Sequence, residues 1–121
     1  MSEDKEATPT PLTPAMFHVL LALADGQKHG YAILKEVARR TSNKVRLSAG
    51  TLYGNLARLE SAGLIAESAS RPTASLDDER RRYYRLTELG REVTIAEVER
   101  MREAVLQARA KNLFRRPRLA Q

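Results

Sequence analysis

The stretch LSAGTLYGNLARLESAGLI, residues 47–65, has the pattern of one capped helix followed by the start of a strand. Ser48 is a good N-cap, because its hydroxyl can accept a hydrogen bond from a free N–H group of the first turn. Gly63 can adopt the left-handed conformation that commonly ends a helix. Between them, leucines at helical spacing predict the buried face: Leu52, Leu56 and Leu59. The stretch therefore predicts a short helix that is packed on one side and runs directly into an extended segment.

Two helices are predicted before this stretch. Thr13 and Pro14 have the pattern of an N-cap and a first helical residue, and the apolar run that follows should end at the Asp-Gly pair 25–26. A second helix should begin near His29 or Gly30. Its outer face is predicted to carry four charged residues, with one i, i+4 pair between the second and the last: Lys35, Glu36, Arg39 and Arg40.

Two strands are predicted after it, over residues 64–68 and 82–86. The second strand alternates, with Tyr84 and Leu86 on one face and Tyr83 and Arg85 on the other. This pattern predicts an antiparallel hairpin whose loop is longer than the usual tight turn. Residues 45–47 are a further candidate for a short extended piece.

A long final helix is predicted from its cap at Thr87 to about Asn112. Its later part carries apolar residues at alternating steps of three and four, the spacing of a short coiled-coil seam: Val98, Met101, Val105 and Ala108. Such a stripe needs a partner if the helix extends from a small domain. A homodimer is the simplest closed solution. The alternative is a helix that folds back on its own domain.

The order of these elements predicts a mainly α fold with a small β hairpin: a winged helix-turn-helix followed by a long C-terminal dimerisation helix. With 121 residues, the chain fits one small domain. A flexible N-terminal arm is expected over residues 1–13, where prolines and small polar residues are frequent. The winged helix-turn-helix should occupy residues 14–86, the dimerisation helix residues 87–112, and a basic tail residues 113–121.

Positive charge is concentrated in two blocks of the chain. Residues 28–58 hold seven basic residues and one acidic residue, and residues 109–121 hold five basic residues and no acidic one. A block of one sign of charge attracts polyanions such as nucleic acid. The alternative is an ordinary solvated surface. Because the first block spans the predicted third helix, double-stranded DNA is the expected partner.

The third helix supplies the side chains that are expected to enter the major groove. With its leucines inward, four residues are predicted to face outward: Ser48, Thr51, Asn55 and Arg58. Asn can pair with adenine, and Arg with guanine, through two hydrogen bonds each. The alternative is that these are ordinary solvent-facing residues.

The hairpin adds three consecutive arginines where a wing would lie beside the duplex: Arg80, Arg81 and Arg82. Arginines in this position are expected to contact phosphate or the minor groove, which sets register more than it reads sequence. Three acidic residues, 77–79, immediately precede them. A local turn held by salt bridges is therefore the alternative.

Three stretches of the chain resemble the PadR-like transcriptional regulators, in particular the short-tailed group with a single C-terminal dimerisation helix. They are LLALADGQKHGYAILKEV at 20–37, LSAGTLYGNLARLESAGLI at 47–65 and DDERRRYYRLTELG at 77–90. The resemblance implies a dimeric winged-helix repressor that binds DNA and whose last helix swaps across the partner.

The resemblance also implies site residues. It places Tyr31, Thr51, Tyr53 and the wing arginines at or near the DNA backbone. From the residues alone, Tyr53 could instead be a partly buried packing residue with its hydroxyl at the rim. The family usually has proline where this chain has Ala49, so the start of the third helix is less rigidly set. Some members of the short group bind flat aromatic drugs between tryptophans, and this chain has no tryptophan.

The residues do not predict an enzyme, a metal site or a cofactor. The chain has no cysteine, and its two histidines are His18 and His29. We expect His18 on the surface of the first helix or half-buried there, and His29 as a local cap. The sequence also lacks a metalloprotease motif, a phosphate-binding glycine loop and a nucleophile elbow.

A small hydrophobic effector is a further candidate partner. The candidate cleft lies between the first and last helices, near Met16, Phe17 and Met101, and core or dimer packing is the alternative role of these residues. No apolar stretch is long enough to cross a bilayer, so a soluble cytoplasmic protein without membrane contact is expected. The alternative to a DNA-binding regulator is a winged-helix protein-interaction module without sequence-specific DNA binding.

Overall fold

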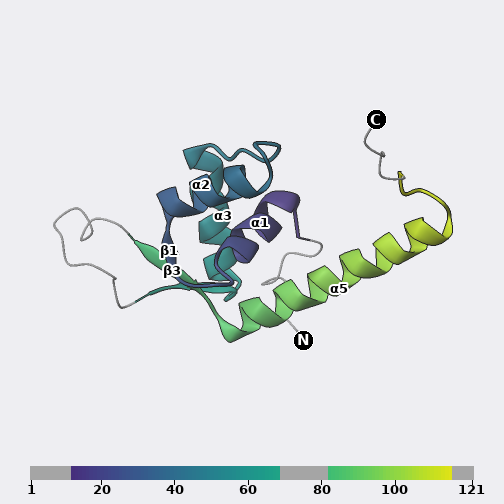
Figure 1. Cartoon of the computed structure of the whole chain (residues 1–121). Helices are drawn as coiled ribbons and strands as arrows, with labels where there is room; N and C mark the ends of the chain where they lie inside the picture. The colour runs from purple at the N-terminus through teal and green to yellow at the C-terminus, as the bar shows by residue number, and fades with distance from the viewer. Residues whose placement is uncertain (1–11, 69–81, 116–121) are drawn as a thin grey trace.

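A computed structural model describes residues 12–68 and 82–115. Three short helices pack beside a small antiparallel sheet, and a long helix extends away from them (Figure 1). In chain order the elements are α1 (Pro14–Ala22), β1 (Lys28–His29), α2 (Gly30–Arg40), α3 (Ala49–Ser61), β2 (Ile65–Glu67), β3 (Tyr83–Leu86) and α5 (Glu88–Ala110). The predicted fold class, a mainly helical winged helix-turn-helix with a long last helix, is confirmed.

Each of the four helices begins at a side chain that accepts a hydrogen bond from the backbone of the first turn. The four caps are Thr13, His29, Ser48 and Thr87. At the start of α3, for example, Ser48 Oγ accepts from the Thr51 N–H at 3.1 Å. All four were predicted, because a capping side chain is a local property of the sequence.

One predicted boundary and one candidate extended segment are wrong. α1 ends at Ala22 rather than at the Asp-Gly pair 25–26, and the Lys28 ammonium group donates to the Ala22 carbonyl at 2.7 Å. Residues 45–47 form no strand. By contrast, Gly63 follows the C-cap of α3 and has a φ of 80°, so it ends this helix in the left-handed conformation as predicted.

The sheet has the order β1-β3-β2, with β3 antiparallel to both neighbours. β1 was not predicted, since two residues are too few to show a period. His29 pairs with Tyr83 across β1 and β3, and the edge of one ring meets the face of the other at 5.3 Å between centroids. Tyr83 is therefore buried together with Tyr84, instead of alternating with it.

Apolar side chains from α1, α2, α3 and the segment 64–65 form one core. Leu12 is part of it, although the flexible arm was expected to extend to residue 13. The packed part of the chain thus begins before α1. Residues 1–11 lie outside the described residues.

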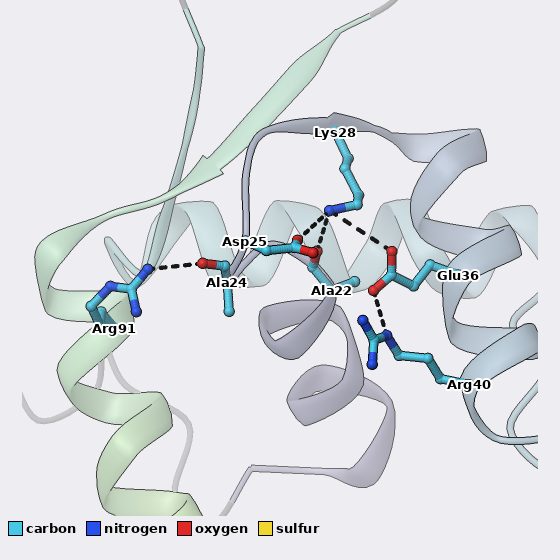
Figure 2. Close-up of polar contacts among 7 residues, drawn as sticks. All are labelled: Ala22, Ala24, Asp25, Lys28, Glu36, Arg40 and Arg91. Atoms are coloured by element: carbon cyan, nitrogen blue, oxygen red, sulfur yellow. Dashed lines mark hydrogen bonds and ion pairs between the residues drawn. The ribbon is translucent and has the colours of Figure 1, made fainter.

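A polar network fixes α2 against the end of α1 (Figure 2). Lys28 donates to Asp25 Oδ1 at 2.6 Å and lies 3.8 Å from Glu36 Oε1. Glu36 Oε2 accepts from Arg40 at 2.6 Å, which confirms the predicted i, i+4 pair. Glu36 is buried, however, and not on the outer face. A buried carboxylate needs such partners, because it would otherwise lose its hydration without compensation.

Two groups of this network, Asp25 and Arg40, have shifted pKa values. The hydrogen bond from Lys28 lowers the pKa of the exposed Asp25 carboxyl. The hydrogen bond to Glu36 raises the pKa of the Arg40 guanidinium. Both cations are thus committed to carboxylates of their own chain near neutral pH.

Among the described residues, the first half of α5 holds the helix to the domain. The Thr87 hydroxyl donates to the Gly63 carbonyl at 2.6 Å, and the Thr87 N–H donates to the Leu64 carbonyl at 3.1 Å. Arg91 donates to the Ala24 carbonyl at 2.9 Å (Figure 2). The far half of α5 projects beyond the other elements (Figure 1).

Candidate nucleic-acid interface

Two tyrosines lie exposed near the starts of α2 and α3. Tyr31 is 61% exposed and Tyr53 is 52% exposed. A Cβ on Gly30 would lie 2.5 Å from the Tyr53 hydroxyl, so a larger residue there would push this ring away from the first turn of α2. The glycine at position 30 is thus explained by α3 packing on α2. The rest of the Tyr53 side chain stays exposed to solvent near the starts of α2 and α3.

The start of α3 presents hydroxyl groups to solvent. Ser48 and Thr51 are both exposed, and Ser48 Oγ donates to Thr51 Oγ1 at 3.0 Å. Helix starts carry partial positive charge and favour anions such as phosphate. Both residues therefore lie where the sequence placed them, at the solvent-facing start of the third helix.

The outermost face of α3 is formed by small side chains. Gly50, Gly54 and Ala57 are exposed, and nothing lies within 4 Å of a Cβ built at either glycine. Neither glycine has a positive φ, so the local backbone does not require them. A face of this kind lets another surface approach the helix backbone closely.

Five exposed cations surround α2 and α3 without an ion pair to another described residue: Lys35, Arg39, Lys44, Arg46 and Arg58. Lys35 also lies 5.2 Å over the ring of Tyr31, which favours a cation–π contact. Within the part of the chain that the structure describes, Lys28 and Arg40 are thus the only cations of the basic block at 28–58 that pair with carboxylates. The remaining charge faces solvent and can contact an external anion.

Asn55 is not on the outer face of α3, contrary to prediction. It is 4% exposed, and its Nδ2 has no hydrogen-bond partner among the described residues. Asn55 shares its side of the helix with Leu59 and Ala62, which are also buried. The buried face of α3 is thus wider than the leucines alone indicate. Asn55 cannot reach a base edge from this position.

Only the last of the three wing arginines lies within the described residues. Arg82 is exposed, and its Nε lies 3.9 Å from Glu67 Oε2 on the neighbouring strand. Arg80, Arg81 and the acidic residues 77–79 lie outside the described residues. The structure therefore places Arg82 at the base of the wing.

The far half of α5 carries exposed apolar side chains. Val98, Met101 and Val105 are exposed, and Ala108 is partly so. The buried residues Gly90, Thr94 and Glu97 precede Met101 at helical spacing, so one face of α5 passes from its own domain into solvent. The first half of α5 thus packs on its own domain, as the alternative expects, whereas the far half does not.

The family comparison matches most of this architecture. A family model described as "Transcriptional regulator PadR-like family" matches residues 19–96, from the second half of α1 into the first half of α5. The chain belongs to the PadR-like family. Its members are transcriptional regulators rather than enzymes.

PadR-like regulators of known structure have the same fold. A transcriptional regulator from Clostridium thermocellum is 30% identical, with a TM-score of 0.62 over 84% of this chain and 92% of that one. A PadR family regulator from Clostridium difficile is 28% identical, with a TM-score of 0.66 over 78% of this chain and 94% of that one.

Curated relatives share only part of their length with this PadR-like chain. The transcriptional regulator Rv3488 of Mycobacterium tuberculosis is 38% identical over 61% of this chain and 63% of its own length. An uncharacterized 37.1 kDa protein in transposon TN4556 of Streptomyces fradiae is 41% identical over 72% of this chain and 23% of its own length. The match thus covers less than two thirds of either relative.

The residues of the candidate effector cleft have separate environments in this PadR-like chain. Met16 and Phe17 are buried, and Met16 packs in the core, whereas Met101 is exposed. Packing alone thus explains Met16. Within the described residues, no helix is long and apolar enough to span a membrane.

Several residues of this interface could not be found from sequence patterns. The glycine at 30 and the small face of α3 follow from packing between helices that are distant in sequence. Lys35 and Arg39 have no ion pair to a described residue because Asp25 and Glu36 form their ion pairs with Lys28 and Arg40. The cluster of basic residues at 28–58 was the one signal that pointed to them.

Acid should weaken the contact between Glu97 and Arg100 at the middle of α5. Arg100 Nε donates to Glu97 Oε1 at 3.1 Å, and this hydrogen bond lowers the pKa of Glu97 below 4.5. Its contribution to the free energy of unfolding is therefore present at neutral pH and lost as pH falls through the lowered native pKa. Denaturant unfolding of Glu97→Gln should show a smaller loss of stability in acid than the parent protein. Glu103→Gln removes an exposed carboxylate that has no ion pair to another described residue and is the control; equal acid sensitivity in all three proteins would contradict the assignment.

Proposed function

We propose that this PadR-like regulator is a homodimeric repressor that binds promoter DNA through α3 and the wing. The observation that carries the proposal is the set of exposed cations beside the starts of α2 and α3 that have no ion pair to another described residue. Charges of this kind contact phosphate and set the position of a helix in the major groove. In this proposal the regulator bound across a promoter blocks transcription from it. Its place of action is the cytoplasm, where bacterial and archaeal chromosomes lie.

Within this proposal the residues of the interface have distinct roles. Tyr31, Ser48, Thr51 and Tyr53 bind the backbone of one strand, because they surround the helix starts. Arg58 reaches a base edge or phosphate from the exposed side of α3. Arg82 contacts the phosphates beside the wing, together with Arg80 and Arg81. Asn55 has no direct role, since it is buried.

The proposed dimer sets the spacing of the two recognition helices. Val98, Met101, Val105 and Ala108 of two copies cover each other, and two copies of α3 then read half-sites about one turn of DNA apart. A hydrophobic effector would have to be held between two copies near Met101, because Met16 and Phe17 are already buried within one chain. Such an effector would release DNA by favouring a different spacing.

Arg58→Ala tests the proposed DNA contact. Arg58 is exposed and without an ion pair to a described residue, so its removal leaves the fold intact. We expect affinity for a duplex selected from random sequence to fall about tenfold and the salt slope to decrease by about one. Anisotropy titrations at several salt concentrations measure both. Arg102→Ala, an exposed arginine on α5, is the matched control and should leave both quantities unchanged.

Two outcomes would count against the proposal. Equal affinities of the parent protein and both variants would remove Arg58 from the interface. Failure of the parent protein to bind any selected duplex would favour a protein-interaction module instead. Transcription in vitro from a promoter that contains the selected site distinguishes repression from activation.

A further inference from the structure

A hollow of about 530 Å³ runs along one side of α2. Its lining starts at Lys28, before the helix, and ends at Asn43, in the turn after it. Part of the wall comes from two small residues, Ala32 and Ala38, whose side chains leave the space open. At the far end the Asn43 N–H donates to the Ala38 carbonyl at 2.7 Å and folds the chain back towards the helix. A hollow of this volume is in the range of small-molecule sites.

The charged network at the edge of this hollow is neutral as a whole. Asp25 and Glu36 carry two negative charges, and Lys28 and Arg40 carry two positive ones (Figure 2). Both oxygens of the Glu36 carboxylate face a cation, with Oε1 at 3.8 Å from Lys28 and Oε2 at 2.6 Å from Arg40. The four charges therefore balance one another, and none is left to neutralise a further cation.

Two more cations line the hollow, Lys35 and Arg39, and neither forms an ion pair with another described residue. They lie one turn apart on α2, at positions i and i+4, where like charges repel each other. The ammonium group of Lys35 lies 5.2 Å from the ring of Tyr31, which favours this position of the side chain. The hollow thus carries two positive charges that an external anion can neutralise.

We propose that the hollow binds a small phosphomonoester, whose phosphate group lies between Lys35 and Arg39. Such a group carries about two negative charges at neutral pH, which matches the two cations. Its oxygens can accept hydrogen bonds from the ammonium group and from the planar fork of the guanidinium. A phosphate of the DNA backbone carries a single charge and would leave one cation uncompensated. The open space beside Ala32 and Ala38 accommodates the body of the ester.

Occupation of this site also affects the proposed DNA contact, and this step rests on the proposed function. Tyr31 is one of the residues that we propose to bind the DNA backbone, and Lys35 lies over its ring. A bound phosphomonoester neutralises two of the five exposed cations around α2 and α3 and brings a negative group close to Tyr31. Such a ligand therefore weakens the attraction of the duplex to this surface.

NMR titration with phenyl phosphate, without DNA and at constant ionic strength, tests the site. We expect the largest shifts at the backbone amides of residues 32–43. The double variant Lys35→Gln with Arg39→Gln should bind about tenfold more weakly. Lys44→Gln with Arg46→Gln is the matched control, because it removes the same charge from exposed cations that do not line the hollow. Equal dissociation constants for the two double variants would overturn the site.

Ala32→Leu separates a defined site from general attraction to a basic surface. It keeps every charge and retains a good helix former, but it fills part of the hollow. We expect phenyl phosphate to bind this variant about tenfold more weakly, because the ligand and the added side chain compete for the same space. Ala57→Leu, on the exposed face of α3, is the control and should bind as the parent does. Affinity of Ala32→Leu equal to that of the parent would also overturn the site.

Duplex titration with and without phenyl phosphate tests the effect on DNA. A saturating concentration should weaken binding of the parent protein to its selected duplex about tenfold and leave the double variant of Lys35 and Arg39 unaffected. Unchanged affinity of the parent would overturn this effect and leave the site standing. If the parent binds the duplex but not phenyl phosphate, the two cations belong to the DNA contact and the site is overturned. If it binds phenyl phosphate but no duplex, only the proposed function and the effect on DNA are overturned.

Discussion

Val105→Asp is expected to produce a folded monomer that has lost almost all affinity for its operator. Val105 is exposed within one chain and belongs to the far half of α5, so the charge does not disturb the core. In the dimer the same carboxylate would be buried against apolar side chains without a partner, which is strongly unfavourable. A monomer holds one recognition helix, and loss of the second half-site contact should weaken operator binding about 100-fold or more.

Light scattering and duplex titration measure this prediction on the same samples. Gln107→Asp is the control, since it adds the same charge to α5 two residues away, on a different face. Val98→Asp should behave as Val105→Asp does. Dimers that persist in Val105→Asp at the concentrations where the parent dimerises would contradict the assignment of the seam.

Gly90→Ala is expected to lower the free energy of unfolding by about 3 kcal/mol, because it forces an atom into a space that is already filled. A Cβ at this position would lie 1.9 Å from the Leu64 carbonyl oxygen. That carbonyl also accepts the N–H of Thr87 at 3.1 Å, so it cannot retreat without losing the hydrogen bond. The first turn of α5 would have to move away from the domain.

Gly54→Ala is the matched control for this substitution. It makes the same chemical change inside a helix, but nothing lies within 4 Å of the added methyl group. We expect it to raise the free energy of unfolding by about 0.5–1 kcal/mol, because alanine favours the helix over glycine. Urea unfolding of both variants compares the two effects, and similar values for both would mean that α5 does not pack closely over Leu64.

The parts of this fold that could be predicted are those that depend on interactions between residues close in sequence. The caps at Thr13, Ser48 and Thr87 each act on the next three residues, and the leucines of α3 repeat within one helix. Features that depend on several elements were missed. The two-residue strand β1 exists because β3 lies beside it.

The site was predictable to the same extent. Ser48, Thr51 and Arg58 are exposed as expected, because they lie opposite the leucines or at the free helix start. Asn55 was misplaced because the leucines indicate the centre of the buried face of α3 and not its width. That width is set by α1, α2 and β2, all of which contact α3.

Gly90 packs closely against Leu64, so the direction of the whole helix α5 is set by the contact of its first turn with the domain. The helix is 23 residues long, or roughly 35 Å at the usual rise. A tilt of about 5° at this contact therefore displaces the far tip by on the order of 3 Å at that length. In the proposed dimer, the packing of Gly90 against Leu64 would therefore set the spacing of the two recognition helices from a place far from any nucleotide.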